Sequence, residues 1–370
     1  MSISILSSLN AWRVSLFMKI RKRNYERGYL NDIRGKIAAL SNPQELSKEQ
    51  EKEISNYYTG LIGKDVPHEW HRYFFARTGS FAKEYIPTGF YRTELFGKIN
   101  NDPFRAAYGD KNLAEILFPN APHPKTFLRN INGYYYVDGK PVSEETAIER
   151  CKNLGDVIIK PSLECRGKGV QRVALSNGKI DGTHQTISEL FGSYSRDFLV
   201  QEVIKQHDIM AALNPSSINT IRIVTYRSGM DVVVLYSVIR IGRKGAVIDN
   251  ECAGGISTYI DENGRLGRFA YGAPGEDRIE KSDTGVVLSG YVIPSFKEVI
   301  ELVKGLHYSL PFFNIVGWDI AIGEAGNPIL VEWNTCPDFS QSAFGPAFGK
   351  YTERIIKDNY YKPNTVNVNW

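Results

Sequence analysis

The stretch of sequence that decides the fold is VGWDIAIGEAGNPILVEWNTCPDF, residues 316–339. Two apolar runs flank GEAGNP, whose glycines and proline are typical of a hairpin turn. The simplest register about that turn places Asp319 directly opposite Glu332. On the other face, the same register pairs aromatic or β-branched residues: Trp318 with Trp333, Ile320 with Val331 and Ile322 with Ile329. We therefore expect an antiparallel hairpin with one apolar face and one polar face.

The polar face of this hairpin carries two carboxylates and one amide. Glu332 and Asn334 point the same way, and Asp319 lies across from Glu332. Gly317 leaves space opposite Asn334. Like charges that face each other on a sheet repel unless positive charge lies between them, so removing one carboxylate is expected to relieve the repulsion. A divalent cation held by Asp319, Glu332 and Asn334 supplies that charge, and all-oxygen ligands favour Mg²⁺ or Mn²⁺. The alternative is a surface hairpin whose carboxylates are solvated.

A second candidate site is the glycine-containing loop in IIKPSLECRGKGV, residues 158–170. A buried strand that ends at Lys160 delivers an ammonium group at a fixed edge, and Gly167 and Gly169 flank Lys168 in the loop that follows. Backbone amides freed by glycine approach phosphate oxygens closely, while the lysines supply charge. The GxxxxGK[ST] spacing of a Walker A motif is absent, and an ordinary hairpin loop is the alternative.

A third candidate is FLVQEVIK, residues 198–205, whose composition predicts a strand. If the edge of this strand is exposed, the backbone of Glu202–Ile204 is available to hydrogen-bond an adenine ring. Asp208, which follows in QHD, would then receive ribose hydroxyls. An ordinary strand inside a sheet is the alternative.

Six ordered segments resemble the ATP-grasp superfamily and, more narrowly, the sugar-transfer-associated ATP-grasp family. The resemblance covers residues 70–350, and residues 1–65 lie outside it. The segments are YGDKNLAEILFPNAPHP (108–124), Lys160-Pro161 with the RGKGV loop, QEVI (201–204), NPSSINTIRIVTYR (214–227), DNECAGGI (249–256) and WDIAIGEAGNPILVEWN (318–334). The loop departs from a more Gly/Ser-rich family pattern because it carries Glu164, Cys165 and Arg166.

The resemblance implies ATP and Mg²⁺ as cofactors, with a role for each matching residue. Lys111 and Lys160 resemble the lysines that touch ATP phosphates. The other implied nucleotide contacts are a flap over the phosphates (Arg166, Gly167, Lys168 and Gly169), an adenine-binding linker (Gln201, Glu202, Val203 and Ile204) and a ribose contact (Asp208). Asp319, Glu332 and Asn334 match the metal ligands, and Arg222 matches the arginine that faces the transferred phosphate and the acyl oxyanion. The role of Asn250 and the Gly254-Gly255 pair stays open.

The fold implied by the resemblance is an α+β ATP-grasp fold, in which two α+β subdomains grip the nucleotide after a mainly helical N-terminal region. We expect a basic helical extension over 1–65, an N-terminal subdomain over 66–124, a central subdomain with the flap over 125–200, and a C-terminal subdomain with the metal site over 201–370.

The function implied by the resemblance is that of an ATP-dependent carboxylate–amine ligase that forms an amide through an acyl phosphate. Its partners would be small-molecule carboxylate and amine substrates, sugar-linked ones included, in surface-polysaccharide or cell-envelope biosynthesis. One alternative is an ATP-grasp phosphotransferase that phosphorylates a hydroxyl group. The other is a non-catalytic nucleotide-binding protein.

The composition excludes several classes of protein. The chain has 370 residues, of which 42% are hydrophobic and 23% charged, so a disordered chain is excluded. No apolar run approaches the roughly 20 residues that cross a bilayer. The positive charge near the N-terminus follows the apolar residues, which reverses the order of a secretory signal and favours a cytoplasmic protein. The four cysteines lie far apart, which disfavours a zinc site.

The net charge of +4 is distributed unevenly. Residues 11–36 hold eight basic and two acidic residues, a net charge of +6, which leaves −2 for the rest of the chain. We therefore expect no nucleic-acid partner. Apolar residues in and just before this segment recur at near-helical spacing, which predicts a helix packed on the main domain with a solvated basic face. The alternative is peripheral contact with an anionic inner-membrane surface.

Overall fold

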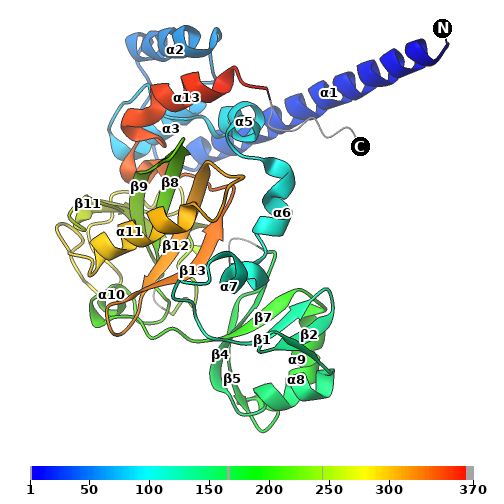
Figure 1. Cartoon of the computed structure of the whole chain (residues 1–370). Coiled ribbons are helices and arrows are strands. Elements are labelled where there is room, and N and C mark those ends of the chain that lie inside the picture. The colour runs from blue at the N-terminus through cyan, green and yellow to red at the C-terminus, as the bar shows by residue number, and fades with distance from the viewer. Residues whose placement is uncertain (1, 165–166, 244, 364–370) are drawn as a thin grey trace. The chain divides into compact units, whose positions relative to one another are not determined.

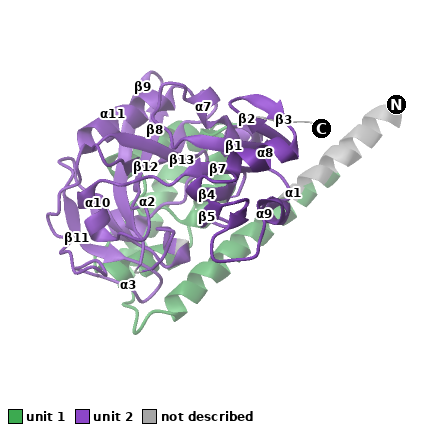
Figure 2. Cartoon of the chain, turned by 90° about the horizontal axis from the view of Figure 1, so that it is seen from below, with its two compact units in different colours: residues 1–101, 345–370 green, residues 102–344 purple. Residues whose placement is uncertain are grey.

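The structure is a computed structural model that describes residues 2–164, 167–243 and 245–363 (Figure 1). It has the expected α+β class, with helices first and two antiparallel sheets after them. The chain divides into two compact units, Met1–Asn101 with Gly345–Trp370, and Asp102–Phe344 (Figure 2). The segment after Phe344 thus groups with the N-terminal helices. The expected boundaries at 65, 124 and 200 divide the chain more finely and stay predictions.

The first unit is helical. Its helices are α1 (Ser2–Ala38), α2 (Lys48–Ile62), α3 (Glu69–Thr78), α4 (Thr88–Phe90), α5 (Phe96–Ile99) and α13 (Thr352–Tyr360), with a π-helical turn at Tyr91–Leu95. Helix α2 begins at a capping box, in which Ser47 and Gln50 each accept a hydrogen bond from the other's backbone amide. The C-terminal turns of α1 bury Ile33 and Ile37 against the aromatic side chains of α3. This packing is the reason that the basic segment ends as a docked helix.

Further toward its N-terminus, α1 carries apolar side chains that face solvent. Leu16, Phe17 and Ile20 are 42%, 63% and 50% exposed. Among the described residues, no helix has both the length and the apolar character needed to cross a membrane. Peripheral membrane contact by residues 11–36 therefore stays a prediction.

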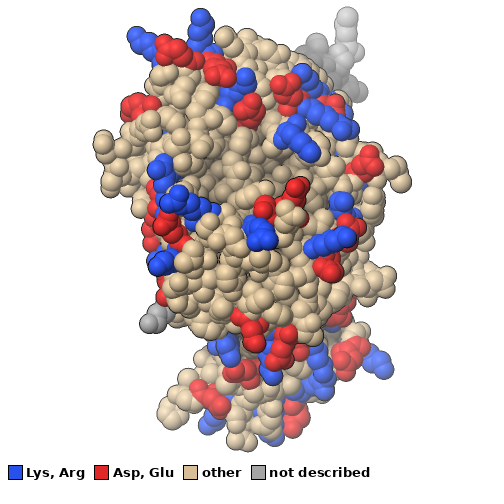
Figure 3. All heavy atoms as spheres, turned by 90° about the vertical axis from the view of Figure 1, so that its left-hand side faces the viewer, with Lys and Arg blue, Asp and Glu red and all other residues tan. Residues whose placement is uncertain are grey.

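On the face of the molecule drawn in Figure 3, basic and acidic side chains are interspersed.

The second unit contains a seven-stranded antiparallel sheet in the order β3-β2-β1-β7-β4-β5-β6. Its strands are β1 (Thr126–Ile131), β2 (Tyr134–Val137), β3 (Lys140–Val142), β4 (Gly155–Pro161), β5 (Gln171–Ser176), β6 (Lys179–Ile180) and β7 (Phe198–Glu202). Helices α8 (Glu144–Cys151) and α9 (Ile187–Tyr194) contribute Ala147, Leu190 and Phe191 to the core of this sheet. Strand β7 is central, which explains why four consecutive residues, Phe198–Gln201, are all buried.

A six-stranded antiparallel sheet in the order β11-β10-β9-β8-β12-β13 completes this unit. Its strands are β8 (Ile221–Ser228), β9 (Asp231–Ile241), β10 (Ile256–Ile260), β11 (Leu266–Tyr271), β12 (Ile315–Ile322) and β13 (Pro328–Asn334). Helix α11 (Phe296–His307) packs on it through Phe296, Val299, Val303 and Leu306, whose spacing forms one apolar stripe. The shorter helices of the unit are α6 (Arg105–Tyr108), α7 (Ala114–Leu117), α10 (Asp208–Leu213) and α12 (Gln341–Phe344).

The hairpin of β12 and β13 has the predicted register at one end only. Asp319 pairs with Glu332 and Trp318 with Trp333, as expected. A β-bulge then shifts the register, so that Ile320 pairs with Leu330 and Ile322 with Pro328. The expected pairs Ile320–Val331 and Ile322–Ile329 are therefore wrong. The physical reason is that Leu330 and Trp333, three residues apart, are both buried, and an extra residue between them is needed to turn both toward the core.

Candidate functional site

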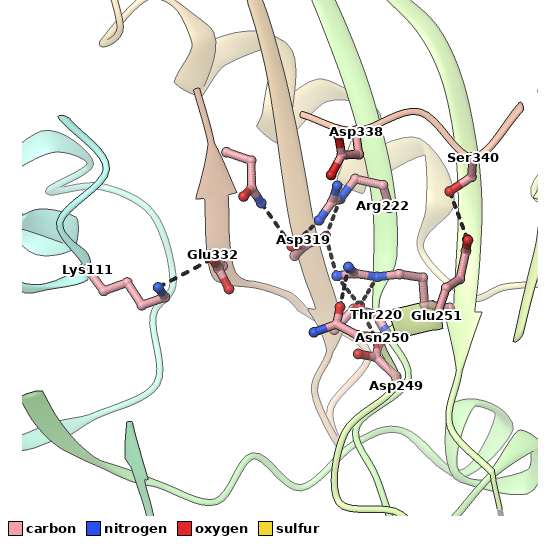
Figure 4. Close-up of polar contacts among 12 residues, drawn as sticks. Lys111, Thr220, Arg222, Asp249, Asn250, Glu251, Asp319, Glu332, Asp338 and Ser340 are labelled. Carbon is pink, nitrogen blue, oxygen red and sulfur yellow. Dashed lines mark hydrogen bonds and ion pairs between the residues drawn. The ribbon is translucent and has the colours of Figure 1, made fainter. Parts of the chain in front are cut away.

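Asp319 lies at the centre of the polar face of the six-stranded sheet (Figure 4). Arg222 is its direct neighbour on β8 and donates two hydrogen bonds, Nε to Oδ1 at 2.6 Å and Nη2 to Oδ2 at 2.8 Å. Nη2 of Arg240, on β9, forms an ion pair with Oδ1 at 2.5 Å. Burial opposes ionisation of Asp319, but the two guanidinium charges outweigh it and lower the pKa of this carboxyl.

The carboxylates of Asp319 and Glu332 are offset by different cationic side chains. Asp319 faces the two arginines, whereas Glu332 Oε1 pairs with Lys111 Nζ at 3.4 Å. Repulsion between the two carboxylates therefore does not by itself require a metal ion, which corrects the argument made from the sequence. Asn334 directs its Nδ2 at Asp319 Oδ2, at 3.4 Å.

The three expected metal ligands nevertheless form an oxygen-rich set on one sheet face. Asp319 and Glu332 are cross-strand neighbours, and Asn334 lies opposite Gly317. No group of three or more His, Cys, Asp or Glu side chains in the described part of the chain is arranged to hold a metal. Two carboxylates and an amide leave several coordination positions for phosphate and water oxygens, which fits Mg²⁺. The metal assignment thus stays a prediction.

The two predicted phosphate-binding lysines lie near Glu332. Lys111 follows Asp110, which caps the turn Lys111–Leu113, and its Nζ donates to the carbonyl of Glu164 at 2.6 Å. Lys160 is a buried residue of β4. Burial lowers the pKa of Lys160 to about 8, Glu332 opposes this change, and the charge of Lys111 adds to it. Lys111, Lys160 and Glu332 therefore form one cluster of interacting charges.

The flap loop adopts the left-handed backbone that its glycines permit. Gly167 and Gly169 have φ angles of 72° and 73°. A Cβ atom at Gly167 would lie 2.9 Å from Ile248 Cγ2 and 3.1 Å from Asn250 Nδ2, so the loop packs closely on the 248–250 segment. Lys168 is exposed, and its Nζ lies 3.8 Å from Glu164 Oε2. Arg166, also predicted in the flap, lies outside the described residues.

The predicted adenine linker differs from the exposed strand edge that we expected. Because β7 lies between β1 and β4, Glu202 is inside the sheet, and its backbone amide donates to the Lys125 carbonyl at 2.9 Å. The expectation of an exposed edge at Glu202 is therefore wrong. Val203 and Ile204 follow the end of the strand, and no hydrogen bond from a described residue reaches their backbone groups.

The remaining two nucleotide contacts predicted from the sequence are the first residue of this linker, Gln201, and the following Asp208. Gln201 is buried, and its Nε2 donates to Thr126 Oγ1 at 3.1 Å, so its side chain ties β7 to β1. Asp208 is exposed at the first position of α10. Its role as a ribose contact stays a prediction.

Sequence reasoning missed a network that fixes Arg240. Its Nη1 donates to Asn250 Oδ1 at 2.6 Å, and Nε and Nη2 donate to Thr220 Oγ1 at 3.2 and 3.0 Å. The Thr220 amide and hydroxyl in turn donate to buried Asp249 Oδ2, at 2.8 and 2.5 Å (Figure 4). Burial raises the pKa of Asp249, while Arg240 and Thr220 oppose the change. The available signal was the arginine near the end of the mostly apolar run Val232–Ile241.

The glycine pair in the DNECAGGI segment has a structural explanation. Gly254 has a φ angle of 93° and ends the short helix Glu251–Ala253. A Cβ atom at Gly255 would lie 2.1 Å from the carbonyl oxygen of Asp249. The pair therefore allows the tight loop that brings Asp249 and Asn250 to Arg240.

A search of curated proteins finds no significant relative. Among solved structures, the ATP-grasp ligase PsnB with its minimal precursor is 14% identical, with a TM-score of 0.39, over 70% of this chain and 63% of that chain. D-alanyl-alanine synthetase A from Vibrio cholerae is 12% identical, with a TM-score of 0.41, over 69% and 66%. This chain thus spans less than two thirds of the length of PsnB.

The family comparison covers most of the chain. The model of the sugar-transfer associated ATP-grasp family matches residues 91–350, a span that includes Lys111, Lys160, Arg222 and the β12–β13 hairpin. ATP-grasp proteins are enzymes that bind ATP with Mg²⁺, and another PsnB structure contains Mg and ADP. The chain belongs to the sugar-transfer associated ATP-grasp family.

Proposed function

We propose that this chain is an ATP-dependent carboxylate–amine ligase that activates a small-molecule carboxylate as an acyl phosphate. The observation that supports this proposal is a cluster of four cationic side chains and two carboxylates within one compact unit: Lys111, Lys160, Arg222 and Arg240, with Asp319 and Glu332. Such a cluster supplies positive charge both to a triphosphate and to an oxyanion that develops during acyl transfer.

The residues proposed to hold Mg²⁺, or Mn²⁺ in its place, are Asp319, Glu332 and Asn334. When bound, the ion would offset negative charge on the phosphates of ATP. The nucleotide itself would be held by the backbone of Val203 and Ile204 at the adenine, by Asp208 at the ribose, and by the flap glycines at the phosphates.

The proposed reaction has two steps. A carboxylate oxygen of the acceptor attacks the γ-phosphorus of ATP, and the bond from that phosphorus to ADP breaks. The amine nitrogen then attacks the acyl carbon, the carbon–oxygen bond to phosphate breaks, and the amine proton is lost as the amide forms. Lys111 and Lys160 would offset phosphate charge throughout, while Arg222 would stabilise the acyl phosphate and the tetrahedral oxyanion. Lys168 would approach the phosphates through movement of its exposed loop.

Membership of this family supports the proposal that the substrates are sugar-linked and that the chain acts in surface-polysaccharide or cell-envelope biosynthesis. A cytoplasmic location, with α1 near the inner membrane surface, is part of the same proposal. The experiment is a screen of amino acids and uronic-acid derivatives for release of ADP and phosphate, with mass spectrometry of the products. A ligase releases free phosphate only when both substrates are present. Phosphate retained on a hydroxyl acceptor would identify a kinase, and no nucleotide turnover with any substrate would favour the non-catalytic alternative.

Arg222→Lys tests the assignment of the arginine. The variant keeps the charge but loses the planar fork, so amide formation should fall roughly 10²- to 10³-fold while ATP affinity changes little. Arg227→Lys is the matched control, because Arg227 lies on the same strand and donates to the Pro311 carbonyl at 2.7 Å instead. Near-normal turnover of Arg222→Lys with a lower melting temperature would mean that Arg222 only pairs with Asp319.

A further inference from the structure

Glu251 is a half-buried carboxylate that the site described so far does not use. Its Oε1 accepts hydrogen bonds from Ser257 Oγ on β10 at 2.5 Å and from Ser340 Oγ, in the segment after β13, at 2.8 Å (Figure 4). Within the described residues, no hydrogen bond reaches its Oε2, and no lysine or arginine forms an ion pair with it. The two serines therefore fix the direction of the carboxylate and leave its second oxygen available to a ligand.

This carboxylate differs from three others near the same polar face of the six-stranded sheet. Asp319, Glu332 and Asp249 each interact with a lysine or an arginine side chain. A half-buried carboxylate has lost part of its hydration, which hydrogen bonds or a positive charge must replace. Both serine hydroxyls of Glu251 are on one oxygen, so the other oxygen favours a ligand that brings positive charge and N–H donors.

The register of the sheet places Glu251 on the same face as Arg222, away from the proposed metal ligands. Ser257 on β10 pairs with Arg240 on β9. Arg222 on β8 pairs with Val238, two residues from Arg240, so both arginines and that serine point to one face. In the strand order β10-β9-β8-β12-β13, the proposed metal ligands lie on the other side of β8. Strands β8 and β10 are two strand spacings apart, about 10 Å.

The charges of Arg222 and Glu251 both act on the buried hydroxyl of Tyr236. Burial raises the pKa of Tyr236, Arg222 opposes the change, and Glu251 and Asp338 add to it. The ring of Tyr236 stacks on Phe344, with ring centroids 3.5 Å apart, so aromatic packing supports this part of the face. Arg222 and Glu251 therefore lie within electrostatic reach of one group, close enough to contact two parts of one substrate complex.

We propose that Glu251 Oε2 accepts a hydrogen bond from the ammonium group of the amine substrate, and that Ser257 and Ser340 hold the carboxylate in position. This inference rests on the proposed function, because it assigns a place to the second substrate of the ligase reaction. A primary amine carries a proton near neutral pH, so the lysines and arginines of this face repel it. A carboxylate without a cationic partner attracts it and selects it over a neutral nucleophile of similar size.

The test compares two kinds of nucleophile, with ATP, Mg²⁺ and the panel of uronic acids. One kind is the amino acids of the screen, which carry an ammonium group. The other is hydroxylamine, which is largely uncharged at pH 7 and converts an acyl phosphate into a hydroxamate. In Glu251→Gln, the ratio of kcat/KM for the amino acid to kcat/KM for hydroxylamine should fall about 10- to 100-fold, the effect of one hydrogen bond between charged groups. The variant keeps an oxygen for both serines, so we expect it to fold.

Glu262→Gln is the matched control, because it removes the same charge from an exposed position just after β10. This control should keep the wild-type ratio. If Glu251→Gln does not fold, Ser257→Ala/Ser340→Ala is measured in its place and should lower the ratio about tenfold, since the carboxylate is then no longer held in position.

Three outcomes overturn the amine site alone. They are an unchanged ratio in the Glu251 or serine variant, an equal loss in Glu262→Gln, and a wild-type chain that uses hydroxylamine but no amine that carries an ammonium group. The absence of hydroxamate from the wild type with every carboxylate would instead contradict the ligase function, and the amine site with it.

Discussion

Replacing Asp319 by Asn should destabilise the protein strongly in metal-free buffer. The repulsion between Asp319 and Glu332, considered alone, favours the opposite result. In the structure, however, Asp319 is the anionic partner of Arg222 and Arg240, at 2.5 to 2.8 Å, and all three side chains are at most 12% exposed. Removing one member of a buried ion pair leaves uncompensated buried charge and costs about 3–5 kcal/mol. Glu332 is 26% exposed and has Lys111 beside it, so the relief of repulsion is the smaller effect.

The assay is urea unfolding at pH 7, followed by tryptophan fluorescence in phosphate-free buffer with chelator. Trp318 and Trp333 both lie in this sheet and report on its unfolding. Asp156→Asn is the matched control, since it also removes a carboxylate that pairs with an arginine at 2.6 Å, but Asp156 and Arg172 are 53% and 43% exposed. The control should change the free energy of unfolding by less than about 1 kcal/mol. If Asp319→Asn is as stable as the wild type, or no less stable than the control variant, the two-arginine account is refuted.

Three further predictions concern pH and backbone geometry. Burial lowers the pKa of His71 and of His307 to about 4, so the contribution of each to stability is fully present above pH 6.5. As the pH falls from 6.5 to 4, the free energy of unfolding should decrease by up to about 3 kcal/mol per residue. Replacing His307 by Gln should make the midpoint of urea unfolding less dependent on pH in this range. Because the pKa of Lys160 is about 8, ATP affinity should weaken above pH 8, and Lys160→Arg should remove this dependence in a fluorescent-nucleotide titration. Gly255→Ala should disrupt the loop at Arg240 and lower the melting temperature, whereas Gly305→Ala, where no atom lies within 4 Å of the added Cβ, should raise or maintain it.

Local sequence determined those parts of the site that depend on neighbouring positions in the chain. A strand alternates its side chains with a period of two, and GEAGNP supplies a turn, so the pairing of Asp319 with Glu332 followed from spacing alone. Gly167 and Gly169 are likewise explained locally, because both residues adopt positive φ angles that favour glycine. Lys160 was identified from the strand on which it lies, whereas Lys111 was identified only through the family resemblance.

Tertiary structure alone decided which strands lie side by side and where the register shifts. The central position of β7, which places Glu202 inside the sheet, depends on pairing with strands far away in the chain. The bulge in the β12–β13 hairpin arises because the core must bury both Leu330 and Trp333. Arg240 reaches Asp319 across β8, through a strand pair that itself contains a register shift. Each of these features depends on long-range packing, which no local pattern of residues encodes.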